Sequence, residues 1–182
     1  SLWGIGRNDY GQLGDGSNND RSKVFKILSS GLESVDAGSF HSVFTKKDGS
    51  LWGMGNNEYG QLGDGTMKNR NSPILIQKSG VESASAGFDF TVFVKTDGSL
   101  WGMGRNDYGQ LGDVSVISRK IPVKIVESGV ASASAGGGHL LFVQNDGSLW
   151  GIGRNGLGQL GLGDQTDRKK PTVIENSTII QV

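Results

Sequence analysis

Histidine, aspartate and glycine are the residue types through which this chain could do chemistry. The sequence has no cysteine, so thiolate catalysis, thiolate metal ligands and disulfides are excluded. Its two histidines, His41 and His139, have no recognisable third ligand or carboxylate partner that would complete a metal site or a catalytic triad. We therefore predict no catalytic residue and no metal site, and we expect that the protein is not an enzyme.

Two short motifs resemble ligand-binding loops, and neither is complete. The Gly-x-Gly pair that begins at Gly4 lacks the third glycine and the following helix of a dinucleotide-binding loop. The Asp-x-Ser-x-Asn motif that begins at Asp15 resembles a calcium loop, but the position of the bidentate glutamate is occupied by Lys26. We interpret the residues of the Asp15 motif as solvated turn residues and the Gly-x-Gly pair as part of a strand, and we predict no cofactor.

The residues above belong to four copies of one sequence unit. The strings SLWGIGRNDYGQLGDG, SLWGMGNNEYGQLGDG, SLWGMGRNDYGQLGDV and SLWGIGRNGLGQLGLG begin 49 residues apart. A fixed period of this size is typical of stacked supersecondary units that cannot bury their apolar faces alone. We predict one partial domain over residues 1–182, with repeats 1–49, 50–98, 99–147 and a truncated 148–182.

Each unit has the pattern of four short antiparallel strands and no helix. In the second unit, the small residues 81–87 precede the β-branched and aromatic residues 90–95. An Asp-Gly pair at 97–98 predicts a hairpin with a type I′ turn, and residues 100–104 form the return strand. The last strand is expected at 122–125, where a proline suits an edge. Repeated four-stranded units predict an all-β fold, a β-propeller with four-stranded antiparallel blades.

The size of the residues agrees with this architecture. Ser, Ala and Gly in 81–87 suit the crowded axis of a propeller, whereas tryptophans fill the wider space between blades. The chain holds about three and a half blades, and its last residues, ending at Val182, resemble the first strand of a further blade. We predict a structural role for the tryptophans, namely Trp3, Trp52, Trp101 and Trp150.

Charge and hydropathy exclude two classes of partner. Lys plus Arg and Asp plus Glu both number 18, so the chain has no net charge with which to hold nucleic acid or an anionic membrane. No apolar stretch approaches ~18 residues, the length of a membrane-spanning helix. We therefore predict no nucleic-acid partner and no membrane partner.

The repeated string resembles that of a known family. Asp-Gly-Ser-Leu-Trp-Gly-x-Gly-x-Asn-x-Tyr-Gly-Gln-Leu-Gly-Asp-Gly, preceded by Ala-Gly-x-x-His, is similar to the regulator of chromosome condensation repeat over the whole chain. The resemblance implies a propeller that usually has seven blades, and the near-identical repeats resemble the bacterial branch of the family. It also implies that partners are bound by residues after Ala-Gly on one ring face.

Two segments vary between the otherwise constant repeats, and loops on a rigid scaffold are where binding usually resides. One follows Gly-Gln-Leu-Gly, and the other follows Ala-Gly. Aromatic residues of the second segment are candidate anchors for another protein, although they could instead pack against a neighbouring blade. The histidines occupy a repeat position that the middle copy fills with phenylalanine, which favours a structural role for them. The candidate partner-binding residues are Phe40, His41, Phe88, Asp89, Phe90 and His139.

Three functions are consistent with these observations. The first is a noncatalytic protein-binding module, or scaffold, that uses the loops of one ring face. The second, implied by the family, is a regulatory propeller that acts as a guanine-nucleotide exchange factor or a secreted enzyme inhibitor. The third is an architectural repeat of a larger surface protein or assembly. Further blades of a longer chain, or a second copy, would close the ring. The compartment stays open, with a secreted or cell-surface bacterial location favoured over the cytoplasm.

Overall fold

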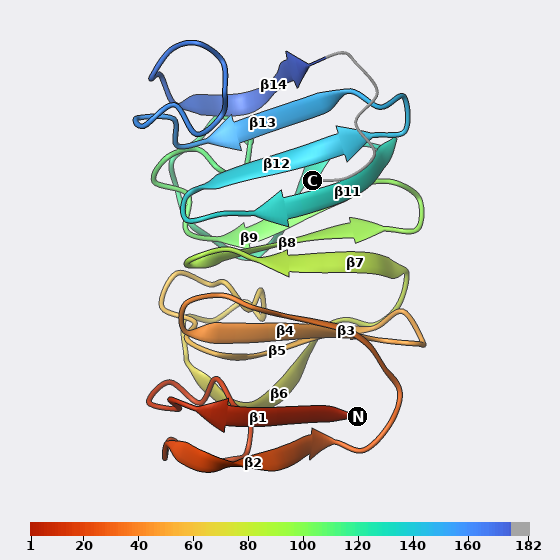
Figure 1. Cartoon of the computed structure of the whole chain (residues 1–182), viewed down its shortest axis with the longest axis vertical. Coiled ribbons are helices and arrows are strands. Elements are labelled where there is room, and N and C mark those ends of the chain that lie inside the picture. Colours follow the sequence, from red (N-terminus) through yellow and green to blue (C-terminus); the bar gives the residue numbers. More distant parts are fainter. Residues whose placement is uncertain (176–182) are drawn as a thin grey trace.

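The computed structural model describes residues 1–175, and these form fourteen β-strands and no helix (Figure 1). The strands group into one two-stranded and three four-stranded sheets. In chain order they are β1 (Leu2–Gly6), β2 (Arg21–Leu28), β3 (Leu32–Ala37), β4 (His41–Lys46), β5 (Leu51–Gly55), β6 (Arg70–Gln77), β7 (Val81–Ala86), β8 (Phe90–Lys95), β9 (Leu100–Gly104), β10 (Arg119–Val126), β11 (Val130–Ala135), β12 (His139–Gln144), β13 (Leu149–Gly153) and β14 (Arg168–Glu175).

Each four-stranded sheet is an antiparallel meander in chain order, and the sheets stack along the long axis of the molecule (Figure 1). The first strands, β3, β7 and β11, lie next to one another along the inner side of the stack. The predicted all-β fold of four-stranded antiparallel blades is therefore confirmed, with three complete blades and the two-stranded β1–β2. The further strand predicted near Val182 lies outside the described residues.

The hairpins between second and third strands are present, but their turns differ from the predicted type I′. The turn after β4 is closed by Gly49 N–H, which donates to the Lys46 carbonyl at 2.9 Å, and Gly49 has a φ of 75°. Asp48 keeps an ordinary negative φ because its carboxylate accepts hydrogen bonds from the backbone and hydroxyl of Ser50. A three-residue loop with glycine in the left-handed position therefore replaces the two-residue turn.

The outer strand begins earlier than the sequence predicts. β10 spans Arg119–Val126, so Pro122 lies inside the strand rather than at its start. Pairing with β9 is irregular between Arg119 and Val123. β10 is the outer strand of its sheet, and a proline there removes no N–H that the ladder needs.

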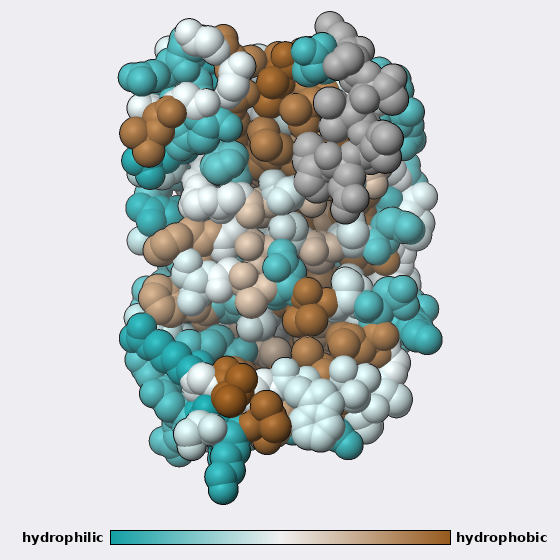
Figure 2. All heavy atoms as spheres, in the orientation of Figure 1, coloured by the Kyte–Doolittle hydropathy of each residue, from teal (hydrophilic) through white to brown (hydrophobic). Residues whose placement is uncertain are grey.

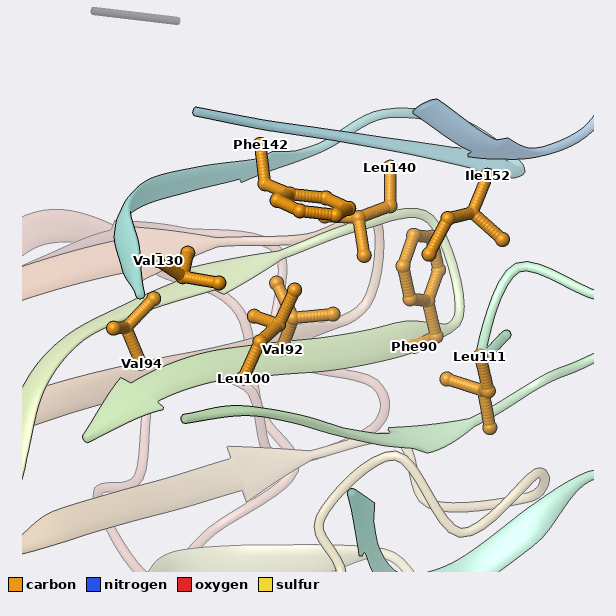
Figure 3. Packing of buried hydrophobic residues seen from close by; sticks show 9 residues of the cluster. All are labelled: Phe90, Val92, Val94, Leu100, Leu111, Val130, Leu140, Phe142 and Ile152. Carbon is orange, nitrogen blue, oxygen red and sulfur yellow. The ribbon is translucent and has the colours of Figure 1, made fainter. Parts of the chain in front are cut away.

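The hydrophobic core lies between successive sheets. Strand β8 shows how: Phe90, Val92 and Val94 face the next sheet, whereas Phe93 on the alternate side packs toward the preceding one. Figure 3 shows Phe90, Val92 and Val94 packed against Leu140 and Phe142 of β12. Because each interface is built from two sheets, no blade has a core of its own.

The tryptophans lie on the face that each blade turns toward the preceding blade. Trp52, Trp101 and Trp150 are half-buried and stack on a phenylalanine of the neighbouring strand, with ring centroids 6.3, 6.4 and 6.1 Å apart. Trp3 is 51% exposed because no described sheet lies over this face of β1. Hydrophobic residues are visible at the surface over this end of the stack (Figure 2). The structural role of the four tryptophans remains a prediction.

Hydrogen bonds between side chains and backbone join the blades near the axis. The Asp36 carboxylate of β3 accepts from Ser85 Oγ and Ala86 N of β7, both at 3.0 Å. Ser85 Oγ in turn accepts from Ala135 N of β11 at 3.1 Å. These contacts fix each blade's rotation against the next, and thereby the positions of the loops that the blades carry. Within the described part of the chain, nothing forms a helix long and apolar enough to cross a membrane.

Candidate protein-binding face

Two sets of connections lie together at one end of the blades, and we call their surface the loop face. The short set, 38–40, 87–89 and 136–138, joins first to second strands. The long set, 7–20, 56–69, 105–118 and 154–167, joins third to fourth strands. Backbone hydrogen bonds hold the two sets together. Asn56 N–H donates to the Phe40 carbonyl at 2.7 Å. In the next two blades, Arg105 N–H donates to the Asp89 carbonyl and Arg154 N–H donates to the Gly138 carbonyl, both at 2.9 Å.

A buried asparagine holds each long loop from inside. Asn57 Oδ1 accepts from Leu62 N at 2.9 Å, while its Nδ2 donates to Asp64 at 3.1 Å. The same contacts recur at Asn8 and Asn106, and each of these asparagines is fully buried. A buried amide with this many partners is expensive to disrupt, so the loops are rigid supports for the side chains that they expose.

The Asp-x-Ser-x-Asn motif is used within the protein. Asp15 accepts from Ser17 and forms an ion pair with Arg21. Hydrogen bonds from Ser17, Arg21 and Asn8 outweigh the effect of burial and lower the pKa of Asp15 to about 2. Among the described residues, no group of three or more His, Asp or Glu side chains could hold a metal ion.

Three aromatic side chains form a cluster on the loop face. The rings of Tyr10 and Phe40 are 5.0 Å apart, and those of Phe40 and Phe88 are 6.5 Å apart and nearly perpendicular. The Arg7 guanidinium lies over the Phe40 ring at 5.2 Å. Phe88 is 49% exposed although its backbone is fixed by a hydrogen bond to the Gly136 carbonyl. The cluster therefore presents an amphipathic surface on a fixed frame.

The remaining candidate residues are less accessible. Phe90 lies fully inside the core, and His41 is buried with its Nε2 2.9 Å from Thr91 Oγ1. Burial lowers the pKa of His41 to about 4, with Asp36 acting in the opposite direction. His139 is half-buried, and burial lowers its pKa as well. Of the six candidates, Phe40 and Phe88 meet in one cluster, in which Phe88 is exposed and Phe40 is half-buried. The partner-binding assignment remains a prediction.

Asp89 occupies a separate part of the loop face. Its carboxylate is 3.4 Å from Arg105, and Arg105 also pairs with Asp107 at 2.7 Å. The guanidinium of Arg105 lies 4.9 Å from the centre of the Tyr59 ring. Burial nevertheless raises the pKa of Asp89, because the ion pair does not fully replace the lost water.

Sequence reasoning missed the tyrosines and arginines of the loop face. Tyr10, Tyr59 and Tyr108 recur at one repeat position, and a residue that recurs in this way is usually a packing residue. All three are only half-buried, and an arginine lies over Tyr59 and over Tyr108. The available signal was the tyrosine of one repeat, followed four strands later by the arginine that comes directly after a Gly-x-Gly strand.

The short turns surround a shallow hollow of about 310 Å³. Its wall consists mainly of the Ala-Gly pairs 37–38, 86–87 and 135–136, with Ser39 and Phe88 at its edge. The variable segment that follows Gly-Gln-Leu-Gly in the third repeat exposes the apolar residues Val114, Val116 and Ile117, and Ile121 of the adjoining β10 is exposed as well.

Comparison with known proteins gives a consistent result. The family model described as "Regulator of chromosome condensation (RCC1) repeat" matches residues 1–45, 48–94, 97–143 and 146–182. A second model of the same description matches 33–61 and 81–110. No curated protein matches the chain.

Solved structures with a similar fold include three structures of two propeller proteins. Human WBSCR16 is 23% identical, with a TM-score of 0.80 over 94% of this chain and 46% of its own. Prp20p from Saccharomyces cerevisiae is 21% identical, with a TM-score of 0.83 over 96% of this chain and 46% of its own. Yeast Prp20 in its structure with Kap60 is 22% identical, with a TM-score of 0.80 over 96% and 44%. The chain thus spans less than half the length of these proteins, and the likeness shows a β-propeller fold.

Proposed function

Because this chain belongs to the regulator of chromosome condensation (RCC1) repeat family, we propose that it is a noncatalytic protein-binding propeller that contacts its partner through the loop face. The role requires exposed side chains on a rigid frame and no reacting group. Both variable segments of the repeats belong to loops on a scaffold of sheets, where binding residues are commonly found.

The cluster of Tyr10, Phe40 and Phe88, in which Phe88 is exposed and the other two rings are half-buried, carries the proposal. Aromatic side chains contribute a large contact area with few rotatable bonds, and they dominate the energetics of many interfaces. Arg7 beside Phe40 adds a cation that a partner's polar groups can meet at the edge of the cluster. Asp89 is buried beside Arg105, and His139 is half-buried at the start of β12, so these two would contribute at most secondary contacts.

Protein partners of a relative agree with this role. The yeast propeller Prp20p has described binding properties to Gsp1p and histones, and it has been solved bound to Kap60. We carry over the general property of binding proteins and not the identity of the partners. We also propose that another blade, from a longer chain or a second copy, covers the face of β1 that exposes Trp3 and Ile5.

The test is affinity capture with matched variants. Immobilised wild-type protein is compared with Phe40→Ala, Phe88→Ala and Lys47→Ala, the last on an exposed turn at the opposite end of the blades. We expect that one set of proteins is retained by the wild type and by Lys47→Ala and is lost from both phenylalanine variants. Equal retention by all four would contradict the proposal. Urea unfolding of each variant separates lost binding from lost folding.

The other functions predict different results. A regulatory propeller would change the activity of the captured protein, either by accelerating nucleotide release or by stoichiometric inhibition. An architectural repeat would retain no specific protein on the loop face. The same capture experiment, followed by an activity assay of the captured protein, distinguishes these outcomes.

A further inference from the structure

The loop face contains the same niche three times. Each niche combines a tyrosine from one blade with two residues of the next blade: the last residue of its short turn and the residue that follows its third strand. Backbone hydrogen bonds join these last two residues in every niche. The members are Tyr10, Phe40 and Asn56 in niche 1; Tyr59, Asp89 and Arg105 in niche 2; and Tyr108, Gly138 and Arg154 in niche 3.

Side chains of the chain itself fill the first two niches. In niche 1 the Phe40 ring packs on Tyr10 at 5.0 Å. In niche 2 Arg105 lies over Tyr59 and binds two carboxylates, those of Asp89 at 3.4 Å and Asp107 at 2.7 Å. Niche 2 therefore shows which ligand this arrangement of tyrosine and arginine holds.

Niche 3 keeps the tyrosine and the arginine but has neither carboxylate. Arg154 lies 5.2 Å from the centre of the Tyr108 ring, as Arg105 does over Tyr59. Glycine occupies both acidic positions, since Gly138 replaces Asp89 and Gly156 replaces Asp107. Arg154 is exposed, and within residues 1–175 its guanidinium forms no ion pair.

We propose that Arg154 binds a carboxylate of an acidic side chain on a protein partner, which takes the position that Asp89 and Asp107 occupy in niche 2. Tyr108 holds the planar guanidinium in place, which reduces the entropy lost on binding. Leu157 of the same loop is 78% exposed and offers an apolar contact to the residue next to the acid. The proposal rests on the proposed function, because it places a partner on the loop face.

A carboxylate introduced into the chain by substitution would compete with a partner for Arg154. Gly156 has open space where a Cβ would be added and no left-handed φ, so Gly156→Asp should fold and place a carboxylate on Arg154 as Asp107 does on Arg105. Gly138→Asp is a second such variant, for which Tyr108 must yield slightly because the added Cβ lies 3.0 Å from its ring. Arg154→Gln removes the charge directly.

The experiment follows the Nε–Hε signals of the arginines by NMR during titration with N-acetyl-aspartyl-leucinamide. We expect a saturable shift of the Arg154 signal in the wild type and no comparable shift of Arg105, whose carboxylates are already in place. Gly156→Asp, Gly138→Asp and Arg154→Gln should weaken binding by about tenfold or more, since each removes or occupies a charge-assisted hydrogen-bonding site.

Three outcomes would overturn the inference. These are equal binding of the dipeptide by Gly156→Asp and wild type, equal shifts of the two arginines, and a shift with inorganic phosphate at lower concentration than with the dipeptide. The capture experiment separates this inference from the proposed function. If Phe88→Ala loses the partner and Gly156→Asp keeps it, the loop face binds a protein and Arg154 is not part of the contact.

Discussion

His41 Nε2 on β4 lies 2.9 Å from Thr91 Oγ1 on β8, so a buried hydrogen bond joins two different blades. Thr91 donates its hydroxyl proton to the Gln61 carbonyl at 2.8 Å, and His41 must therefore donate through Nε2. Nδ1 then carries a lone pair and has no partner among the described residues. The imidazole is held in its neutral form because a proton on Nδ1 would place a charge in the core.

We predict that stability falls as the pH drops from about 6.5 to 4. The unfolded chain protonates His41 near its ordinary pKa of 6.5, whereas burial holds the folded-state pKa at about 4. The full stability is present above pH 6.5, and about 3 kcal/mol of it is lost by the time the pH has fallen to 4. Urea unfolding across this range measures it. His41→Phe, which copies Phe90, should flatten the dependence, and an unchanged slope would contradict the assignment.

Val114→Gly should stabilise the protein. Val114 has a φ of 69°, where the equivalent positions hold Gly16, Gly65 and Gly163. Its N–H reaches the Lys169 carbonyl at 3.2 Å, compared with 2.8 Å from Gly65 to Lys120. A β-branched residue in the left-handed region is strained, and after the entropy of the added glycine we expect a gain of about 1 kcal/mol. Thermal unfolding of this variant and of Val114→Ala, which should gain less, provides the check.

Gly60→Ala and Gly158→Ala should differ although they occupy the same repeat position. Both glycines have a left-handed φ, 83° and 74°. A Cβ on Gly60 would lie 2.4 Å from Lys120 Cα of the next blade, whereas one on Gly158 would meet nothing within 4 Å. We expect about 1–2 kcal/mol of backbone strain in Gly158→Ala and a larger loss in Gly60→Ala. Equal losses in denaturant unfolding would show that the loop moves away from the blade.

Phe90→Ala and Phe88→Ala should separate a core residue from a surface residue. Phe90 is fully buried between two sheets, so its truncation should cost about 3–5 kcal/mol. Phe88 is half exposed, and Phe88→Ala should change the free energy of unfolding by less than about 1 kcal/mol. A large loss in Phe88→Ala would make this residue part of the core and remove the basis for its role as an anchor.

The repeated sequence determined the strands and the blades. The β-branched and aromatic residues 90–95 identified a strand, and the period of 49 residues predicted the stack. The strand and turn signals are local, because residue composition and turn residues act within a single unit. Even the wrong turn type after β4 concerned only the φ of Asp48, since the hairpin itself formed where Asp-Gly predicted it.

The tertiary structure decided which residues of the variable segment are available to a partner. Phe88 and Phe90 are two positions apart and chemically identical, yet one is half exposed and the other lies in the core. The difference depends on where the short turn ends and β8 begins, and on the sheet that packs over it. Likewise, Gly138 and Gly156 look unremarkable in the sequence. They leave Arg154 without a carboxylate only because successive blades bring Tyr108 together with the turn and the arginine of the next blade, which follow it by 30 and 46 positions.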